Sequence, residues 1–193
     1  MRVWFLAGIL CTLLFGEEFI RSDLPLIKPF GTKYALHQSK PAKEQPLQAL
    51  ARVYASRQVE YENLKAVTLA MMMLESGRGK SDLAMRHNNF GGLKYRPEMA
   101  KIAKKVRYRA NDGFDFYCQF DSLDSFIEGF WFFLDRKPYQ GWRSHTKSEQ
   151  AFLEFIAPIY CPFNDEYISS VMRLLPEAKA LLAQSSGYRV AIR

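Results

Sequence analysis

Apolar residues recur at three- and four-residue intervals along four stretches of the chain, and this period predicts amphipathic helices. The stretches are residues 61–76, 122–135, 148–156 and 165–175. Pro158 is expected to stop the third helix and Pro176 the fourth, because proline lacks the amide hydrogen that a helix interior uses. An aromatic stripe on the second helix is expected to face the core: Phe126, Phe130, Phe133 and Leu134.

Short polar side chains mark the starts of these helices. Asp121 and Asn164 are expected to cap helices 122–135 and 165–175, because a side-chain oxygen at this position accepts a hydrogen bond from a first-turn amide. Ser81 is expected to cap a short helix in the same way, over residues 82–86.

Between these helices the pattern changes to that of a β-hairpin. Residues 105–108 and 114–120 predict two strands, and Asp112-Gly113 between them is a hairpin turn signal. The chain therefore predicts a mainly α (α+β) domain in which a helical lobe carries a small β-hairpin lobe.

The N-terminal residues have a different pattern. Residues 3–15 form an apolar run that is short for a membrane span but fits a signal peptide, so residues 1–16 are expected to be a signal peptide or an N-terminal anchor. A buried first helix is the alternative. Residues 17–43 carry prolines and charges without periodicity and predict a linker. We expect an exported protein, periplasmic or extracellular and without a stable membrane span, with a catalytic domain over 44–184 and a tail over 185–193.

The length and composition indicate one domain, and the net charge indicates the charge of its partner. The 193 residues are 48% hydrophobic, which suits one ordinary core. A net charge of +7 predicts an anionic partner, which a cell-wall polymer or a nucleic acid would satisfy. The densest basic patch, residues 101–109, has no zinc-finger spacing or phosphate loop beside it. We therefore expect no nucleic-acid binding and a solvated cationic face.

Cysteine and histidine offer little further chemistry. If Cys11 leaves with a signal peptide, Cys118 and Cys161 remain, either as a disulfide or as two unrelated buried thiols. His87 and His145 belong to no triad pattern, so a cysteine nucleophile is not expected. No spacing suggests a metal site, and we expect no cofactor.

The candidate chemistry centres on Glu75, at the end of helix 61–76. Its neighbours three and four positions back are Met72 and Met71, so the carboxyl is expected to share a helix face with thioether groups. Such surroundings disfavour the ionised form and raise the pKa, and a glutamic acid protonated near neutral pH can give a proton to a leaving oxygen. A carboxyl exposed at the helix end is the alternative.

Two polar, glycine-bearing turns follow Glu75, over residues 76–79 and 88–92, and are expected to fold back beside it. Side-chain amides and glycines that admit a ligand suit sugar binding, although they are also ordinary turn residues. Phe90, Tyr139 and Trp142 fall in turns near polar residues and are candidates for stacking on a sugar ring. For Trp142, packing in the core is an equal alternative.

The order of these residues resembles the glucosaminidase family of peptidoglycan hydrolases, glycoside hydrolase family 73. The matching segments are ESGRGKSDLA at 75–84, NNFGGLK at 88–94, FDSLDSFIE at 120–128, and Tyr160 with YISSV at 167–171. The resemblance covers about residues 44–182. It implies a lysozyme-like α-lobe, peptidoglycan glycan strands as the partner, and hydrolysis of β-1,4 bonds on the reducing side of N-acetylglucosamine.

By this resemblance Glu75 is the general acid, and Tyr167 positions water or the substrate's N-acetyl group. The tyrosine segment 160–167 is one residue longer than the family's usual pattern, so which tyrosine faces the substrate is open. The expected substrate-binding residues are Ser76, Asn88, Asn89, Phe90, Gly91, Lys94, Tyr160 and Trp142.

The second acid that many members of the family carry has three candidates, Glu98, Asp112 and Asp115. Asp112 is taken into the expected catalytic set, although Asp112-Gly113 is also explained as a simple turn. If no second carboxylate acts, the sugar's own N-acetyl group would be the nucleophile. A lytic transglycosylase and a non-catalytic wall-binding module are the alternative functions.

Overall fold

The structure, a computed structural model, describes residues 44–110 and 113–187. The expected signal peptide or anchor, the expected linker and Asp112 lie outside the described residues.

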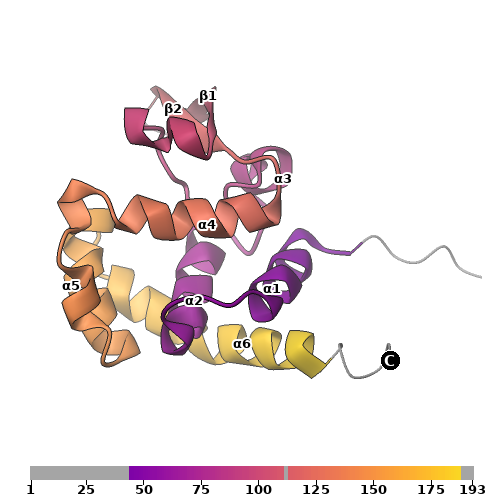
Figure 1. Ribbon diagram of the computed structural model, residues 1–193, viewed down its shortest axis with the longest axis vertical. Coiled ribbons are helices and arrows are strands. Elements are labelled where there is room, and N and C mark those ends of the chain that lie inside the picture. The colour runs from indigo at the N-terminus through magenta and orange to yellow at the C-terminus, as the bar shows by residue number, and fades with distance from the viewer. Residues whose placement is uncertain (1–43, 111–112, 188–193) are drawn as a thin grey trace, which may run out of the picture. The chain divides into compact units, whose positions relative to one another are not determined.

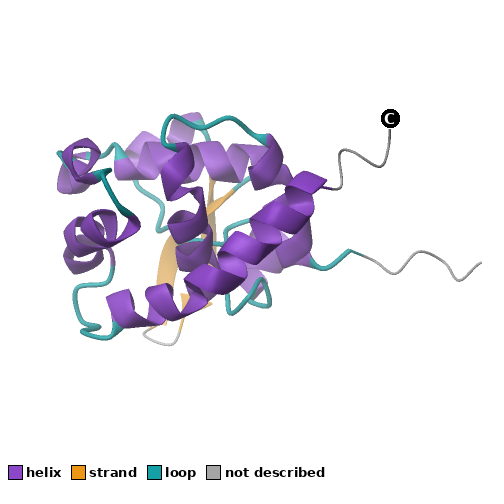
Figure 2. Cartoon of the chain, turned by 90° about the horizontal axis from the view of Figure 1, so that it is seen from below, coloured by secondary structure: helices purple, strands orange, loops and turns teal. Residues whose placement is uncertain are grey.

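The described residues form a helical domain with one antiparallel hairpin (Figures 1 and 2). In chain order the elements are α1 (Pro46–Ser56), η1 (Glu62–Leu64), α2 (Lys65–Glu75), α3 (Asp82–His87), η2 (Pro97–Lys101), β1 (Lys104–Ala110), β2 (Gly113–Gln119), α4 (Leu123–Leu134), η3 (Lys137–Tyr139), η4 (Trp142–His145), α5 (Glu149–Tyr160) and α6 (Tyr167–Gly187). The predicted architecture, a mainly α lobe with a small β-hairpin lobe, is confirmed.

Helix α2 is the centre of the core. Every residue from Lys65 to Met73 is buried, because the sequence KAVTLAMMM leaves hardly any polar face. Helix α6 packs along both α2 and α1. The aromatic stripe predicted for α4 is also confirmed as core, since Phe126, Phe130 and Leu134 are fully buried. Glu75, the last residue of α2, is carried out of this core to its edge.

The helix starts confirm one predicted cap, at Ser81, and correct two. Helix α6 begins at Tyr167 and not at residue 165, so Asn164, whose Oδ1 accepts from the Glu166 amide, lies too early to cap it. The Ser81 side chain accepts a hydrogen bond from the Ala84 amide, as predicted. Helix α4 is capped by Ser122, because the Ser122 and Ser125 hydroxyls accept each other's backbone amides. Asp121 lies one residue too early and forms an ion pair with Lys104 at 2.6 Å.

Both prolines expected to end helices lie inside them. Helix α5 continues past Pro158 to Tyr160, and α6 continues past Pro176 to Gly187. Each proline is exposed, whereas its helix keeps an apolar face on the core through residues such as Ala157 and Ala178. Burial of that face offsets the hydrogen bond that each proline removes. The predicted helix ends were therefore wrong.

The hairpin has two different faces, because side chains alternate along each strand. Tyr108 and Tyr117 form an edge-to-face pair on one face, with ring centroids 5.6 Å apart. On the other face Lys105 lies over the Phe116 ring at 3.8 Å and Arg107 over the Phe114 ring at 4.3 Å. The basic run therefore includes cations that cover two exposed aromatic rings.

The two described cysteines are free thiols. Cys118 is fully buried in β2, and burial raises the pKa of its thiol to about 12. A thiol that stays protonated is unreactive, so the structure favours the reading of two unrelated thiols over a disulfide.

Candidate active site

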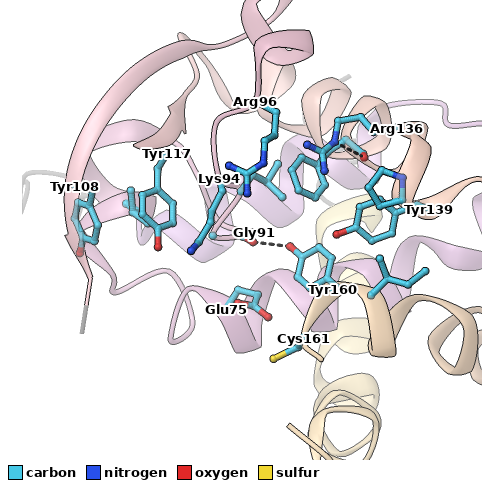
Figure 3. Close-up of a pocket in the computed structure, with 16 residues that line it drawn as sticks. Glu75, Gly91, Lys94, Arg96, Tyr108, Tyr117, Arg136, Tyr139, Tyr160 and Cys161 are labelled. Atoms are coloured by element: carbon cyan, nitrogen blue, oxygen red, sulfur yellow. Dashed lines mark hydrogen bonds between the residues drawn. The ribbon is translucent and has the colours of Figure 1, made fainter. Parts of the chain in front are cut away.

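A cleft of about 910 Å³ opens between the C-terminal end of α2, the Gly91-Gly92 turn, the hairpin and the C-terminal ends of α4 and α5 (Figure 3). Among the described residues that line it, Glu75 is the only carboxyl, and the cations are Lys94, Arg96 and Arg136. Aromatic rings form much of the remaining wall: Tyr108, Tyr117, Phe133, Tyr139 and Tyr160.

The environment of Glu75 confirms the raised pKa that its sequence neighbours predicted. Met71 and Met72 are fully buried one turn back on α2. Burial raises the pKa of the Glu75 carboxyl from 4.5 to about 7, and the nearby Tyr167 hydroxyl lowers it only in part. A substantial fraction of the carboxyl is therefore protonated at neutral pH.

The first turn after Glu75 is held by Ser76. Its hydroxyl donates to the Met72 carbonyl at 2.6 Å and accepts from the Gly79 amide at 2.8 Å. The Ser76 side chain is 1% exposed, so its contacts are with the protein. We therefore assign it a positioning role, which is to end α2 directly after Glu75.

The second turn folds back beside Glu75, as predicted. A Cβ placed on Gly92, whose φ is +58°, would lie 3.5 Å from the Glu75 Oε2 atom. A residue without a side chain in this left-handed conformation lets the turn approach the carboxyl.

Two asparagines tie this turn to the rest of the domain. Asn88 has a φ of 50° and donates its side-chain amide to the Phe120 carbonyl at 3.0 Å. Asn89 is buried and makes three bonds: its Nδ2 donates to the carbonyls of Leu93 and Cys118, and its Oδ1 accepts from the Leu93 amide. Both side chains bind backbone, so they build the site rather than line it.

The sequence left open whether Tyr160 or Tyr167 faces the substrate. Tyr160 lines the cleft and donates its hydroxyl to the Gly91 carbonyl. Tyr167 is the first residue of α6, although the helix was expected to begin at residue 165; it is 1% exposed and does not line the cleft.

The Tyr167 hydroxyl makes no hydrogen bond of ordinary geometry within the described residues. Burial, followed by the neighbouring Tyr160 and Glu75, raises its pKa well above the usual value. Tyr167 therefore stays neutral, and it lies beside Glu75 in the protein interior.

Lys94 lines the cleft and forms an ion pair with Asp115 of β2 at 2.8 Å. The hydrogen bond from Lys94 lowers the pKa of Asp115, which stays ionised. Asp115 and Glu98 do not belong to the lining, and Asp112 lies outside the described residues. The described lining of the cleft thus contains one carboxyl, that of Glu75. The ionised carboxyl of Asp115 is outside the lining and is paired with Lys94.

Two of the three aromatic residues proposed for stacking on sugar need correction. Phe90 is 1% exposed and packs against Phe126, and Trp142 is 2% exposed and donates its Nε1 to Asp135 at 3.0 Å. Neither lines the cleft, because turns in the sequence can still be covered by distant helices. Tyr139 does line it, although it is only 5% exposed.

Arg96, Arg136, Tyr108 and Tyr117 line the cleft but were not predicted. The alternation of β1 and β2 would have placed the two tyrosines on one face. Nothing local distinguishes the two arginines from the many other surface cations.

Among the described residues, no group of histidine, cysteine or carboxyl side chains is arranged to hold a metal ion. No helix in the same ranges is long and apolar enough to cross a membrane.

Comparison with known proteins identifies the class. The family model described as mannosyl-glycoprotein endo-beta-N-acetylglucosaminidase matches residues 51–180. The chain belongs to this glucosaminidase family, and the predicted resemblance is confirmed. Among solved structures it is similar to the catalytic domain of the autolysin Auto from Listeria monocytogenes, with 18% identity and a TM-score of 0.46 over 78% of this chain and 92% of that chain. No curated protein matches.

Proposed function

We propose that this domain hydrolyses peptidoglycan, cleaving the β-1,4 bond on the reducing side of N-acetylglucosamine, with Glu75 as the general acid. The observation that carries the proposal is that Glu75, the single carboxyl in the described lining of the cleft, has its pKa raised to about 7 by burial. Membership in the glucosaminidase family supports N-acetylglucosamine as the sugar whose bond is cleaved. A wall substrate also agrees with the export expected from residues 1–16.

In the proposed reaction the protonated Glu75 gives its proton to the glycosidic oxygen as the bond to the anomeric carbon breaks. The departing sugar leaves with that proton, and positive charge develops at the anomeric carbon of N-acetylglucosamine. Tyr167, neutral and buried beside Glu75, is proposed to hold the carboxyl in place. Tyr160 is proposed to fix the Gly91-Gly92 turn in place through its hydrogen bond to the Gly91 carbonyl.

The second half of the reaction needs a nucleophile. Two-carboxylate enzymes use an ionised acid there, and the described lining offers none besides Glu75. This favours attack by the substrate's own N-acetyl oxygen, followed by water. Asp115 or Asp112 of the hairpin would act instead if substrate binding brought one of them to the anomeric carbon.

The same single carboxyl favours one second candidate, a lytic transglycosylase. Such an enzyme uses one glutamate as acid and then as base, and the substrate's own hydroxyl closes an anhydro ring. It would leave anhydro-muramic ends, whereas the proposed hydrolase would leave reducing N-acetylglucosamine ends.

The pH dependence of the reaction follows from Glu75. A general acid acts only while protonated, so we expect kcat/KM to fall as the pH rises through about 7, the raised pKa of Glu75. Initial rates of sacculus solubilisation between pH 4 and pH 9 would measure this limb. A rate that stays flat to pH 9 would remove Glu75 from the acid role.

The test of function is mass spectrometry of the fragments that the full-length protein releases from purified sacculi. New reducing N-acetylglucosamine ends establish the proposed reaction. Anhydro-muramic ends would establish the transglycosylase instead. Retention on sacculi with no release would mean a wall-binding module and would overturn both.

A further inference from the structure

Two cleft residues, Arg96 and Arg136, have no role in the proposed chemistry. Both line the cleft, and neither forms an ion pair within the described ranges. The third cleft cation, Lys94, differs because Asp115 neutralises it. Glu98 and Asp115 act on these arginines only at a distance. Two guanidinium groups without a direct ion pair in a concave site can bind an anion.

Arg136 is held in a defined orientation. Its guanidinium carbon lies 3.9 Å from the Phe133 ring centroid, and its Nε donates to the Phe133 carbonyl at 3.3 Å. The terminal nitrogens make no hydrogen bond to described residues, and Figure 3 shows them directed into the cleft. An arginine fixed by its stem and ring contacts loses little freedom when it binds a ligand.

Arg96 reaches the same part of the cleft from a different segment, the loop before η2 (Figure 3). One of its terminal nitrogens donates to the Tyr95 carbonyl at 2.9 Å, which leaves the other free. Burial lowers the pKa of Arg136, and Arg96 lowers it further, whereas Tyr139 and Glu98 raise it. Like charges brought together in this way favour a bridging anion.

The arginines and Glu75 surround one space. Burial raises the pKa of Tyr139 to about 12, and the same phenol is affected by Arg136, Arg96 and Glu75. Yet the causes that set the pKa of Glu75 are burial and Tyr167, with no arginine among them. The two cations therefore lie in the same cleft without stabilising the Glu75 anion, and their charge is available to a ligand.

We propose that Arg96 and Arg136 form a subsite that binds a carboxylate of the substrate next to the scissile bond. This deepens the proposed function and rests on it for the identity of the polymer. Peptidoglycan offers carboxylates on the lactyl group of muramic acid, when no peptide is attached, and on the stem peptide. A neutral polymer of N-acetylglucosamine offers none, so the subsite would distinguish wall glycan from neutral glycan.

The test measures binding in the Glu75→Gln background of the full chain, so that no ligand is consumed. The three ligands are a disaccharide-peptide fragment, the same disaccharide with a free lactyl carboxyl, and a neutral N-acetylglucosamine oligomer. The variants are Arg96→Gln and Arg136→Gln. Lys137→Gln is the control with the same net charge, because Lys137 is exposed and does not line the cleft.

We expect each arginine variant to raise the Kd of a carboxylate-bearing ligand about 10-fold, which is the loss of one charge-assisted hydrogen bond. The neutral oligomer and the Lys137 control should change less than about 2-fold. The ligand that responds identifies the source: the lactyl carboxyl, the stem peptide, or both.

Two results would overturn the subsite. One is an equal loss for the neutral oligomer, which would mean that the arginines only shape the cleft. The other is an equal effect of Lys137→Gln, which would mean general attraction. Because the readout is binding, it is separate from turnover: charge-selective binding without any glycan cleavage by the wild type would sustain the subsite and overturn the proposed hydrolase.

Discussion

Replacing Glu75 by glutamine is expected to lower kcat on sacculi by about 10³-fold while the fold is retained. The amide has the size of the carboxyl but cannot give up a proton, and Glu75 is the only carboxyl in the described lining of the cleft. Release of soluble fragments at pH 6, where the wild-type carboxyl is largely protonated, would measure the loss. The matched control is Glu154→Gln, an exposed carboxyl on α5 that accepts a hydrogen bond from Gln150 and does not line the cleft.

The Glu75→Gln variant is expected to lose activity but to gain stability above pH 7. This difference separates loss of the catalytic proton from loss of the fold. The folded protein holds the Glu75 proton more tightly than the unfolded chain, because the pKa is raised from 4.5 to about 7. The stability from this group is fully present below pH 4.5 and is lost as the pH rises through 7, by about 3 kcal/mol at 1.36 kcal/mol for each unit of pKa.

Glutamine does not titrate, so the free energy of unfolding of Glu75→Gln should lose this pH dependence, and the variant should be the more stable protein at pH 8. Urea unfolding at pH 5 and pH 8 would measure both proteins. An inactive variant that is also destabilised at both pH values would show a damaged fold instead of a missing acid.

Replacing Asn89 by alanine is expected to cost about 3 kcal/mol of unfolding free energy and most of the activity. The three hydrogen bonds of this buried side chain satisfy the amide and carbonyl of Leu93 and the carbonyl of Cys118. Alanine leaves these backbone groups unpaired. The Gly91-Gly92 turn that lies beside Glu75 loses its link to β2, so activity should fall even under conditions where the variant is folded.

Chemical denaturation and sacculus assays on the same preparations would test both effects. Asn63→Ala is the control, because Asn63 is exposed and makes one bond, to the Thr146 carbonyl at 2.8 Å. A stable, fully active Asn89→Ala protein would contradict the view that this residue positions the turn.

Local patterns were sufficient for much of the fold. The apolar stripe of α2, the Ser81 cap and the existence of the hairpin depend on neighbours within a few residues, and all three were predicted. Pro158 and Pro176 were misjudged because their effect depends on distant packing. Each helix continues through its proline since burial on the core outweighs a local penalty that the sequence shows by itself.

The site divides along the same line. The raised pKa of Glu75 was predictable because its helix neighbours three and four positions back, Met72 and Met71, are apolar and buried. Trp142 was misplaced and Arg136 was missed because exposure depends on elements far away in the chain. A property that depends on one segment, such as the pKa of Glu75, can be predicted from the sequence. The lining of a cleft built from several segments can be identified only once the fold is known.

The outer face of the hairpin affects how the protein behaves in solution. Phe114 and Phe116 are 61% and 42% exposed on this face, and exposed apolar rings on a small sheet invite self-association. Lys105 and Arg107 cover these rings with positive charge, so that two copies approaching through this face would repel each other. Self-association through this face is thus opposed without burying the lobe, and the opposite face, with Tyr108 and Tyr117, remains part of the cleft lining.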